Sequence, residues 1–386
     1  MPDTCYSILH IITRLDCGGS AENTLLTSIG FAEKKHNVTI IYGNNHPSSE
    51  NEKIAREAGV TFVRCKHLVR NISPINDLLS CIHIFKYIKS NNYTILHTHT
   101  SKAGIIGRVA GKLGGIPYIV HTPHGHIFYG YFSNLITRIF ILIEWFTVKW
   151  THAHIALTKK EKEDYLIRHI GRSNRTYVIY SGISMNNYLN PIQTKKDIKK
   201  QLGFDDTHFI CATVARLDPI KNHDMIIDAA LLLKEYENIF RFLFIGDGEL
   251  TCKLKTRIQQ LGLNSMFLFL GWRKDVHEIL PGCDCFVLCS KNEGMGRAFV
   301  EAQAAGLPVI GSRVCGIPEV VVEGITGYLV EPDNTKELAE KIVMLYNKKD
   351  KMKNVALECR NWVNPRFSIS TMIDKIESVY AYIMSR

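Results

Sequence analysis

Apolar runs of strand length alternate with helical patterns along this chain, and that alternation limits the fold more than any other feature. Parallel strands joined by right-handed helical crossovers produce such a pattern, because each strand is buried on both faces. The expected strands cover residues 7–12, 38–42, 59–63, 93–97, 118–120, 154–157 and 177–179, and then 209–214, 242–245, 266–270, 285–289, 309–310 and 327–330. The pattern predicts an α/β protein with parallel sheets.

The alternation is interrupted once, by the polar segment 186–203 with Pro191, and then restarts. A chain of 386 residues has the length of two domains, and a polar, proline-containing segment is typical of a linker. We therefore expect two Rossmann-like domains, residues 1–188 and 189–367, with an interdomain cleft. Ligands of such sheets bind beyond the carboxyl ends of the strands.

The net charge of +10 lies almost entirely in the first half. Residues 1–185 contain 21 lysines and arginines against 12 aspartates and glutamates. This excess suggests an anionic partner: a membrane surface, a phosphorylated substrate or a nucleic acid. The chain has neither a continuous basic block nor a nucleic-acid motif, so nucleic acid is not expected.

The cysteines and the apolar runs indicate the compartment. Eleven cysteines show no disulfide-framework spacing, the N-terminus does not resemble a secretory leader, and no apolar run reaches the length of a membrane span. We expect free thiols and a cytoplasmic protein. A metal site at Cys283, Cys285 and Cys289 is less favoured than buried strand thiols, because CDCFVLC lacks paired C-x-x-C spacing.

After the expected strand 285–289, residues 290–312, SKNEGMGRAFVEAQAAGLPVIGS, predict a glycine-containing turn, a helix and the start of the next strand. Glu293 and Glu301 enclose seven residues, among them Gly294 and Gly296. Two carboxylates beside the free N–H groups of a helix start suit a ring of hydroxyls, since each carboxylate accepts several hydrogen bonds. The alternative is a dipole partner at Glu293 and a solvent-facing side chain at Glu301.

Arg216 directly follows the strand 209–214, and Lys221 lies at the start of the next helix. A planar guanidinium and a compact ammonium together suit a diphosphate, although two surface cations are the plainer interpretation. Gly246 and Arg273 follow the next two strands and are expected near a nucleotide. The G-x-G at Gly246 lacks the third glycine of an NAD fingerprint, which argues against a dehydrogenase.

In the first half, polar and glycine residues follow several expected strands. Gly18 and Gly19 suit a close backbone approach to a ligand, or simply a tight turn. Four histidines follow two successive strands, namely His97, His99, His121 and His124. We expect neutral imidazoles that donate to a hydroxyl, with His124 the first choice. A zinc cluster is the alternative, but no acidic ligand lies nearby in the sequence.

The stretch 135–150, LITRIFILIEWFTVKW, is amphipathic and aromatic. Most such helices pack on their own sheet. With the basic first half, an exposed aromatic edge in contact with a membrane is the alternative.

Several segments together resemble the retaining glycosyltransferases of family 4, which have the GT-B fold: HTHTSKAGIIGRVAGKLGGIPYIVHTPHG, ARLDPIKNH, IGDGEL and EGMGRAFVEAQAAGLPVIGSRVCGIPEVVVEGITGYLVEPDN. The likeness implies that Glu293 meets the donor sugar, with N–H groups of Gly294, Met295 and Gly296 nearby, and that Glu301 holds the ribose. It implies that Arg216 and Lys221 bind the diphosphate, with Gly19 against it. His124 resembles a histidine near the reacting centre.

The resemblance also implies the reaction, which is transfer of a hexose or N-acetylhexosamine from a UDP-sugar with retention, UDP-N-acetylglucosamine being favoured. No Asp-x-Asp triplet occurs, so no metal or other cofactor is expected. The acceptor is expected to be a glycan or lipid-linked sugar at the inner face of the plasma membrane, reached by peripheral contact with anionic lipid. Alternatives are a soluble acceptor such as inositol or an aminocyclitol, or a non-catalytic nucleotide-sugar-binding protein. The C-terminal helix, 368–386, is expected to cross back to the first domain. SGIS at 181–184 departs from the family's usual Gly-Ile-Asp.

Overall fold

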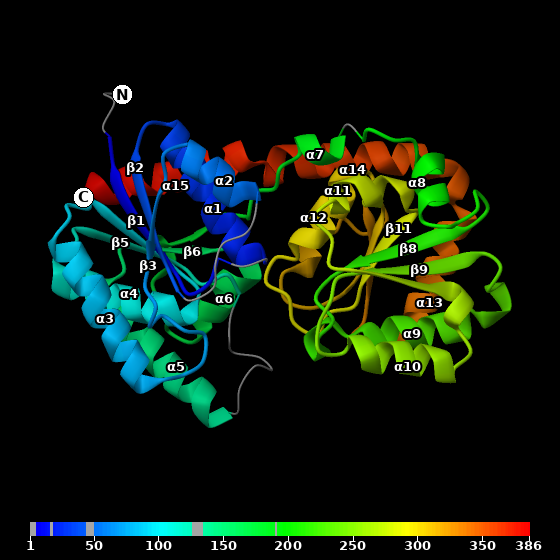
Figure 1. The fold of residues 1–386 in the computed structure, drawn as a ribbon, viewed down its shortest axis with the longest axis horizontal. Helices are drawn as coiled ribbons and strands as arrows, with labels where there is room; N and C mark the ends of the chain where they lie inside the picture. The colour runs from blue at the N-terminus through cyan, green and yellow to red at the C-terminus, as the bar shows by residue number, and fades with distance from the viewer. Residues whose placement is uncertain (1–4, 16–17, 44–49, 126–133, 190) are drawn as a thin grey trace. The chain divides into compact units, whose positions relative to one another are not determined.

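The chain divides into two units in the computed structural model, which describes residues 5–15, 18–43, 50–125, 134–189 and 191–386. Unit 1 comprises Met1–Gly182 and Ile369–Arg386, and unit 2 comprises Ile183–Ser368. Figure 1 shows the helices and strands of each unit. The sequence placed the boundary inside the polar segment near residue 188, whereas the division of the structure falls at Gly182.

The segment 186–203, expected as a linker, contains two helices of unit 2, α7 (Asn186–Leu189) and α8 (Lys195–Gln201). Thr194 caps α8 by accepting a hydrogen bond from the Asp197 N–H at 3.2 Å. Ile198 of α8 is buried against Gly282. One buried apolar side chain and one capping residue therefore fix a segment whose composition looks like a linker.

Unit 1 contains a seven-stranded parallel sheet in the order β3-β2-β1-β4-β5-β6-β7. The strands are β1 (Ser7–Ile12), β2 (Asn37–Tyr42), β3 (Thr61–Arg64), β4 (Ile95–His99), β5 (Tyr118–Thr122), β6 (Ala153–Ala156) and β7 (Thr176–Val178). Strand β4 begins and ends two residues later than the sequence predicts, so its carboxyl end lies at His99 and not at His97.

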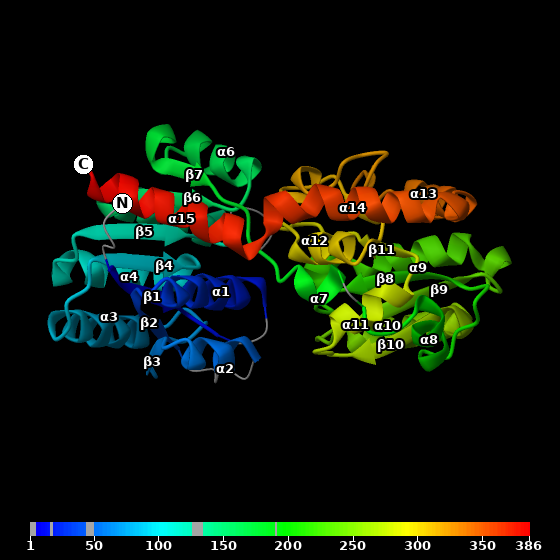
Figure 2. The ribbon, with the colours of Figure 1, turned by 90° about the horizontal axis from the view of Figure 1, so that it is seen from above.

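Helices cover both faces of this sheet, as Figures 1 and 2 show. They are α1 (Gly19–Glu33), α2 (Glu50–Glu57), α3 (Pro74–Lys89), α4 (Ser101–Gly114), α5 (Asn134–Thr147), α6 (Lys159–Ile167) and α15 (Ile369–Met384). α1 packs against α2 and α15 on one face, while α4 packs against α3 and α5 on the other.

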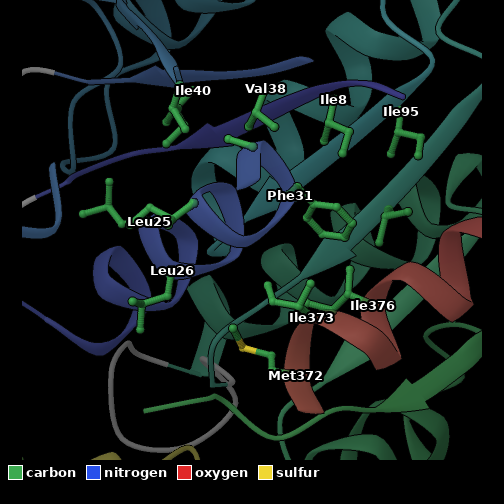
Figure 3. Packing of buried hydrophobic residues seen from close by; sticks show 14 of the residues in the cluster. Ile8, Leu25, Leu26, Phe31, Val38, Ile40, Ile95, Met372, Ile373 and Ile376 are labelled. Carbon is green, nitrogen blue, oxygen red and sulfur yellow. The ribbon is translucent and has the colours of Figure 1, made fainter. Parts of the chain in front are cut away.

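The core of unit 1 follows the two-residue period of its strands. Ile8 and Ile12 of β1 belong to a buried cluster with residues of α1 and α15, whereas Leu9 and Ile11 belong to a second cluster with residues of α3 and α4. Figure 3 shows the first cluster, with Phe31 between the strands and Ile373 and Ile376 of α15. The C-terminal helix thus completes the core of unit 1, which confirms the expected return of the chain.

Unit 2 contains a six-stranded parallel sheet in the order β10-β9-β8-β11-β12-β13. Its strands are β8 (Phe209–Val214), β9 (Phe240–Ile245), β10 (Phe267–Gly271), β11 (Cys285–Leu288), β12 (Val309–Ser312) and β13 (Gly327–Val330). The remaining helices are α9 (His223–Leu232), α10 (Thr251–Gln260), α11 (Val276–Ile279), α12 (Arg297–Ala304), α13 (Thr335–Asn347) and α14 (Met352–Phe367). Both units thus have the predicted parallel α/β fold.

Four thiols of unit 2, in or next to strands of its sheet, are buried. Cys211, Cys285 and Cys289 belong to the buried apolar cluster, and Cys283 is also buried. All are free thiols, and burial raises the pKa of the Cys289 thiol to about 12. The expectation of buried strand thiols is confirmed. Within the part of the chain that the structure describes, no helix combines the length and the apolar character needed to cross a membrane.

Candidate functional site

In each unit the strand order reverses direction next to the first strand of the sheet. In unit 1, β1 lies between β2 and β4, and in unit 2, β8 lies between β9 and β11. The connections leaving two such neighbouring strands go to opposite faces, so a crevice opens beyond their carboxyl ends. In unit 2 this point lies between Val214 and Leu288, the last residues of β8 and β11.

Lys221 and Glu293 meet at this point of unit 2. The Nζ of Lys221 forms an ion pair and a hydrogen bond with the Oε2 of Glu293, and the Ser290 hydroxyl lies 3.3 Å from the same oxygen. The side chains of Lys221 and Glu293 are 21% and 17% exposed. The sequence singled out both residues but gave them separate ligands, whereas in this structure they are bound to one another.

Backbone contacts hold this pair in place. The Asp218 carboxylate accepts the Lys221 N–H at 3.2 Å, at the start of a short 3₁₀ turn. The Lys291 N–H donates to the Ile220 carbonyl at 2.8 Å, which ties the segment after β8 to the segment after β11. The ion pair is therefore built into the junction of the two strand ends.

Arg216 follows β8 and is exposed. Among the described residues its guanidinium has no hydrogen-bond or ion-pair partner. The segment that carries it rests on the end of β9: the Leu217 N–H donates to the Asp247 carbonyl at 3.1 Å, and a Cβ at Gly246 would collide with the Ala215 carbonyl. Gly246, predicted to lie near a nucleotide, thus supports the backbone beside Arg216.

The glycine-containing corner leads from β11 to α12. Gly296 is the N-cap of α12 with a φ of 76°, and a Cβ there would lie 2.8 Å from the Phe299 ring. Positive φ and the close ring both require glycine at this position. Met295 is buried, and the backbone of residues 294–296 forms the approach to the first turn of α12.

Glu301 projects from α12 one turn after Arg297. The Arg297 guanidinium and the Glu301 carboxylate are 3.6 Å apart, and their side chains are 11% and 16% exposed. Arg297 is not among the residues predicted from the sequence, although the i,i+4 spacing of an arginine and a glutamate on a helix is a signal for this contact. A half-buried ion pair holds Glu301, which is thus not a solvent-facing residue.

Arg273 lies beyond the end of β10, the edge strand of the sheet. Its guanidinium binds both carboxylate oxygens of Asp275, with an Nε–Oδ1 distance of 2.7 Å. The two residues line a cavity of about 360 Å³ together with residues of α8 and β10. The structure therefore places Arg273 in a different local environment from the Lys221–Glu293 pair.

In unit 1 a row of hydrogen-bonded histidines lies at the reversal point between β1 and β4. His10 Nδ1 lies 2.8 Å from His99 Nε2, and His99 Nδ1 lies 2.9 Å from His124 Nε2. His10 and His99 are buried, and His124 is half-buried. His10 is not among the residues predicted from the sequence, although a polar residue inside the buried strand SILHII is a signal for it.

Burial determines the protonation of this row. It lowers the pKa of His10 to about 3 and the pKa of His97 and His99 well below the usual range. These imidazoles are neutral at pH 7, so each has one donor and one acceptor nitrogen. If His10 Nδ1 and His99 Nδ1 donate along the row, His124 accepts at Nε2 and carries its own proton on Nδ1.

His97 and His121 do not extend the row. His97 binds the Tyr380 hydroxyl of α15 at 2.6 Å and the Thr122 hydroxyl at 2.8 Å. His121 pairs in register with Thr98, not with His97 or His99, so it lies on the opposite face and binds the Thr98 hydroxyl at 2.9 Å. Successive residues of a strand point to opposite faces, so His121 is separated from the row although it lies at the end of a neighbouring strand.

The turn that carries His124 is held by a buried carboxylate. His124 has a φ of 59°, which is uncommon for a residue with a Cβ. The next N–H, that of Gly125, donates to Glu161 Oε1 at 2.8 Å, and Glu161 is 2% exposed in the first turn of α6. Glu161 is not among the residues predicted from the sequence, although the capping pattern Thr158-x-x-Glu161 is a signal for it.

His10, His97 and His99 also meet the geometric condition for a metal site, since one ring nitrogen from each lies within 4.8 Å of the others. However, five of their six ring nitrogens take part in hydrogen bonds to protein groups. A metal ion would have to replace these bonds, so the donor set fits a hydrogen-bonded row better than a zinc centre.

Gly18 and Gly19 begin α1 of unit 1. Gly18 is the N-cap with extended backbone, and a Cβ added there would meet no atom within 4 Å. The space beside this helix start therefore remains compatible with the expected approach of a ligand.

Comparison with known proteins gives two family matches that together cover most of the chain. Residues 17–187 match the model of Glycosyltransferase Family 4, and residues 194–362 match that of Glycosyl transferases group 1. The chain is 36% identical, over 81% of its length and 81% of the relative's, to a UDP-Gal:alpha-D-GlcNAc-diphosphoundecaprenol alpha-1,3-galactosyltransferase of Escherichia coli.

Two further similarities differ in what they cover. The chain is 29% identical to an N-acetyl-alpha-D-glucosaminyl L-malate synthase of Bacillus anthracis, over 52% of each chain. Among solved structures, HepE of Anabaena in complex with UDP and glucose superposes with a TM-score of 0.83 at 20% identity, covering 98% of this chain and all of the other. The last similarity concerns the fold.

Proposed function

Because the chain belongs to glycosyltransferase family 4 and has the GT-B fold, we propose that it transfers a hexose or N-acetylhexosamine from a UDP-sugar to a hydroxyl of a lipid-linked glycan, with retention of configuration. The observation that carries this proposal is the Lys221–Glu293 pair at the reversal point of the unit 2 sheet. A half-buried cation and carboxylate side by side suit a ligand that has both phosphates and hydroxyls.

The donor contacts follow from this arrangement. Lys221 and Arg216 bind the diphosphate, Arg216 as an exposed fork that is available to phosphate oxygens. Glu293 accepts hydroxyls of the sugar, the corner at Gly294, Met295 and Gly296 offers N–H groups, and Glu301 accepts the ribose hydroxyls. Lys221 is bound to Glu293 before the donor arrives, so binding must replace or share this ion pair.

The same groups serve the reaction. The bond between the anomeric carbon and the β-phosphate oxygen breaks, and the electron pair stays on UDP, where Lys221 and Arg216 stabilise the negative charge. The acceptor oxygen bonds to the anomeric carbon on the face that UDP leaves, and its proton passes to a phosphate oxygen. The two cations take the place of a divalent metal, and Glu293 is not a nucleophile.

We assign His124 to the reacting sugar. Its ring is hydrogen-bonded to His99, and the Glu161 carboxylate holds the turn that carries it. With His124 Nε2 accepting from the row, Nδ1–H donates to a sugar hydroxyl. His10 and His99 are then positioning residues, which act through His124.

A lipid-linked acceptor is favoured over a soluble one by the comparisons and by the surface of unit 1. The relative with a diphosphoundecaprenol acceptor is similar over 81% of both chains, whereas the malate synthase is similar over 52%. Large apolar side chains are exposed on the helices of one face of unit 1: Ile75, Leu78, Leu79 and Ile82 on α3, and Leu135, Ile139, Leu142, Trp145 and Phe146 on α5.

This apolar face is accompanied by basic residues. Lys86 and Lys89 lie in the last turn of α3, and Lys149 lies 3.9 Å from the ring centre of Trp145. With the positive charge of the first half, these side chains suit the headgroups and acyl boundary of an anionic bilayer. We therefore place the enzyme at the cytoplasmic face of the membrane as a peripheral protein.

The decisive experiment incubates the purified chain with UDP-galactose, UDP-N-acetylglucosamine and related donors, and detects UDP release with and without lipid-linked acceptors. We expect turnover with one donor class and an α-linked product from an α-linked donor by NMR. Inversion at the anomeric carbon would refute the retaining mechanism, and turnover with a soluble acceptor alone would refute the lipid-linked one.

Membrane contact is tested by co-sedimentation with phosphatidylglycerol vesicles. Leu142→Asp on α5 should weaken sedimentation, whereas Ile192→Asp, at an 89% exposed residue of unit 2, should not. Equal sedimentation of the two variants would contradict the role of this face.

A further inference from the structure

We propose that a cavity of unit 1 binds the diphosphate of the lipid-linked acceptor, an inference that rests on the proposed function. The cavity has a volume of about 470 Å³ and lies beyond the ends of β1 and β3. It is lined by two arginines, Arg14 and Arg70, and by the polar residues Asn71, Ser73 and Asn76. The sequence analysis gave none of these residues a role.

Close backbone packing forms this cavity. Gly43, just after β2, donates its N–H to the Thr13 carbonyl at 3.2 Å. A Cβ at Gly43 would collide with the carbonyls of both Thr13 and Leu68. Glycine therefore lets the end of β1, which leads to Arg14, approach the segment after β3, which leads to Arg70.

A second set of contacts holds the segment of Arg70. Lys102, in the first turn of α4, donates to the Asn71 carbonyl and forms an ion pair with Asp77 of α3 at 2.6 Å. His67 Nδ1 lies 3.2 Å from the Asn76 side-chain oxygen, and the Asn76 amide donates to the Ser73 hydroxyl at 2.9 Å. The walls of the cavity are thus fixed by three elements of one unit.

The charge of the cavity suits a phosphate group. Among the described residues that line it there is no carboxylate, and the adjacent acid, Asp77, is bound by Lys102. Arg70 is exposed, and within the described residues its guanidinium has no partner. Two arginine forks with serine and asparagine donors can bind the several oxygens of a diphosphate.

An apolar surface begins at the rim of the same cavity. Ser73 and Asn76 line the cavity, while their neighbours Ile72 and Ile75 are 58% and 76% exposed, and Leu78 one turn later is 61% exposed. A polar cavity beside an apolar helix face matches an amphiphile whose diphosphate is attached to a hydrocarbon chain. A soluble sugar phosphate would use the cavity and not the helix.

Calorimetry with the full chain can test this site with three probes: geranyl diphosphate, geraniol and inorganic pyrophosphate. Geranyl diphosphate should bind most tightly. Arg70→Ala should raise its Kd by about tenfold or more, the effect of losing one charge-assisted hydrogen bond, and Arg70→Lys should recover part of this loss. Lys66→Ala, an exposed cation of the same segment outside the cavity lining, is the matched control and should change little.

Leu78→Asp separates the two parts of the site. It should weaken geranyl diphosphate while leaving pyrophosphate unchanged. If Arg70→Ala and the wild type bind geranyl diphosphate equally, the site is wrong. If Leu78→Asp weakens the binding of pyrophosphate as much as that of geranyl diphosphate, the assignment of α3 to the lipid is wrong.

The failure of this inference can be distinguished from failure of the proposed function, because UDP binding does not involve Arg70. If wild type and Arg70→Ala bind UDP equally and transfer sugar to a lipid-linked acceptor with the same KM, the enzyme is a transferase and this site is wrong. If the wild type neither binds UDP nor turns over any donor, the proposed function itself is wrong.

Discussion

Replacing Lys221 by alanine tests the candidate donor site most directly, since Lys221 binds Glu293 in the ligand-free protein. We propose that the diphosphate takes over this cation. The substitution removes a charge that is only 21% exposed, and leaves Glu293, 17% exposed, as a carboxylate facing the incoming phosphates. Both effects weaken the binding of UDP.

The magnitude follows from the partial burial of the pair. Two unit charges about 4 Å apart at an effective dielectric constant of about 20 interact by about 4 kcal/mol. Part of this gain is lost because Lys221 must give up its contact with Glu293 when it binds phosphate. We therefore expect a net loss of about 2–3 kcal/mol, which is a rise in the Kd for UDP of about 30- to 150-fold.

Isothermal titration calorimetry with UDP measures this loss. Lys291→Ala is the matched control, because Lys291 lies on the same segment as Glu293 but is 56% exposed and 3.8 Å from Asp333. The Kd of this variant for UDP should stay within about twofold of the wild type. Glu293→Gln should leave UDP binding unchanged or tighter, since it releases Lys221, and should reduce sugar transfer. An unchanged Kd in Lys221→Ala would refute the role of Lys221, and weaker UDP binding in Glu293→Gln would refute the competition between carboxylate and phosphate.

Three further predictions concern the metal, the buried histidines and a buried ion pair. Excess EDTA should leave turnover unchanged if, as we propose, Arg216 and Lys221 stabilise the diphosphate in place of a metal. Loss of activity restored by Mg²⁺ would contradict this. Burial lowers the pKa of His154 to about 3, so this ring is neutral when folded and takes a proton on unfolding below its ordinary pKa of 6.5. The free energy of unfolding should therefore be fully retained above pH 6.5. Below this pH it should fall with acidification by about 1.4 kcal/mol per pH unit for each such histidine. The ring nitrogens of His154 have no partner among the described residues, so His154→Phe should make urea unfolding less pH-dependent. Arg108→Leu should lower the free energy of unfolding in urea by about 3–5 kcal/mol, because it leaves the 3% exposed Glu144 unpaired. The double variant with Glu144→Leu should recover most of this loss. A single variant as stable as the double one would contradict this account.

Much of the fold could be predicted because each strand has its own signal. The apolar runs locate β1 and β8 to the residue. The helices α3 and α14 have no such signal. α3 exposes many of its apolar side chains, and α14 includes Pro365, a residue that normally ends a helix. The spacing of apolar residues predicts a helix only where one face of that helix is buried.

The sequence predicts several residues of the candidate site, but it does not predict which of them contact one another. Lys221 and Glu293 lie 72 positions apart, and only the order of the strands, which places β11 beside β8, brings them together. The cavity at Arg14 and Arg70 had no signal at all, because it depends on the space left by Gly43 between two carbonyls. A sequence pattern gives the chemistry of a residue, whereas the sheet order decides its partner.

The two units use the reversal of strand order for different chemistry. In unit 2 the reversal point between β8 and β11 carries an ion pair that is open enough for a charged ligand, with both side chains about one-fifth exposed. In unit 1 the point between β1 and β4 carries neutral rings, of which His10 and His99 are buried. A buried neutral row cannot compensate the charge of a phosphate, but it can fix the orientation and tautomer of the half-buried His124 ring. We therefore propose that the charge chemistry of the transfer belongs to unit 2 and that His124 of unit 1 orients a neutral sugar. In this proposal Arg14 and Arg70, beyond the ends of β1 and β3, bind the charged part of the acceptor.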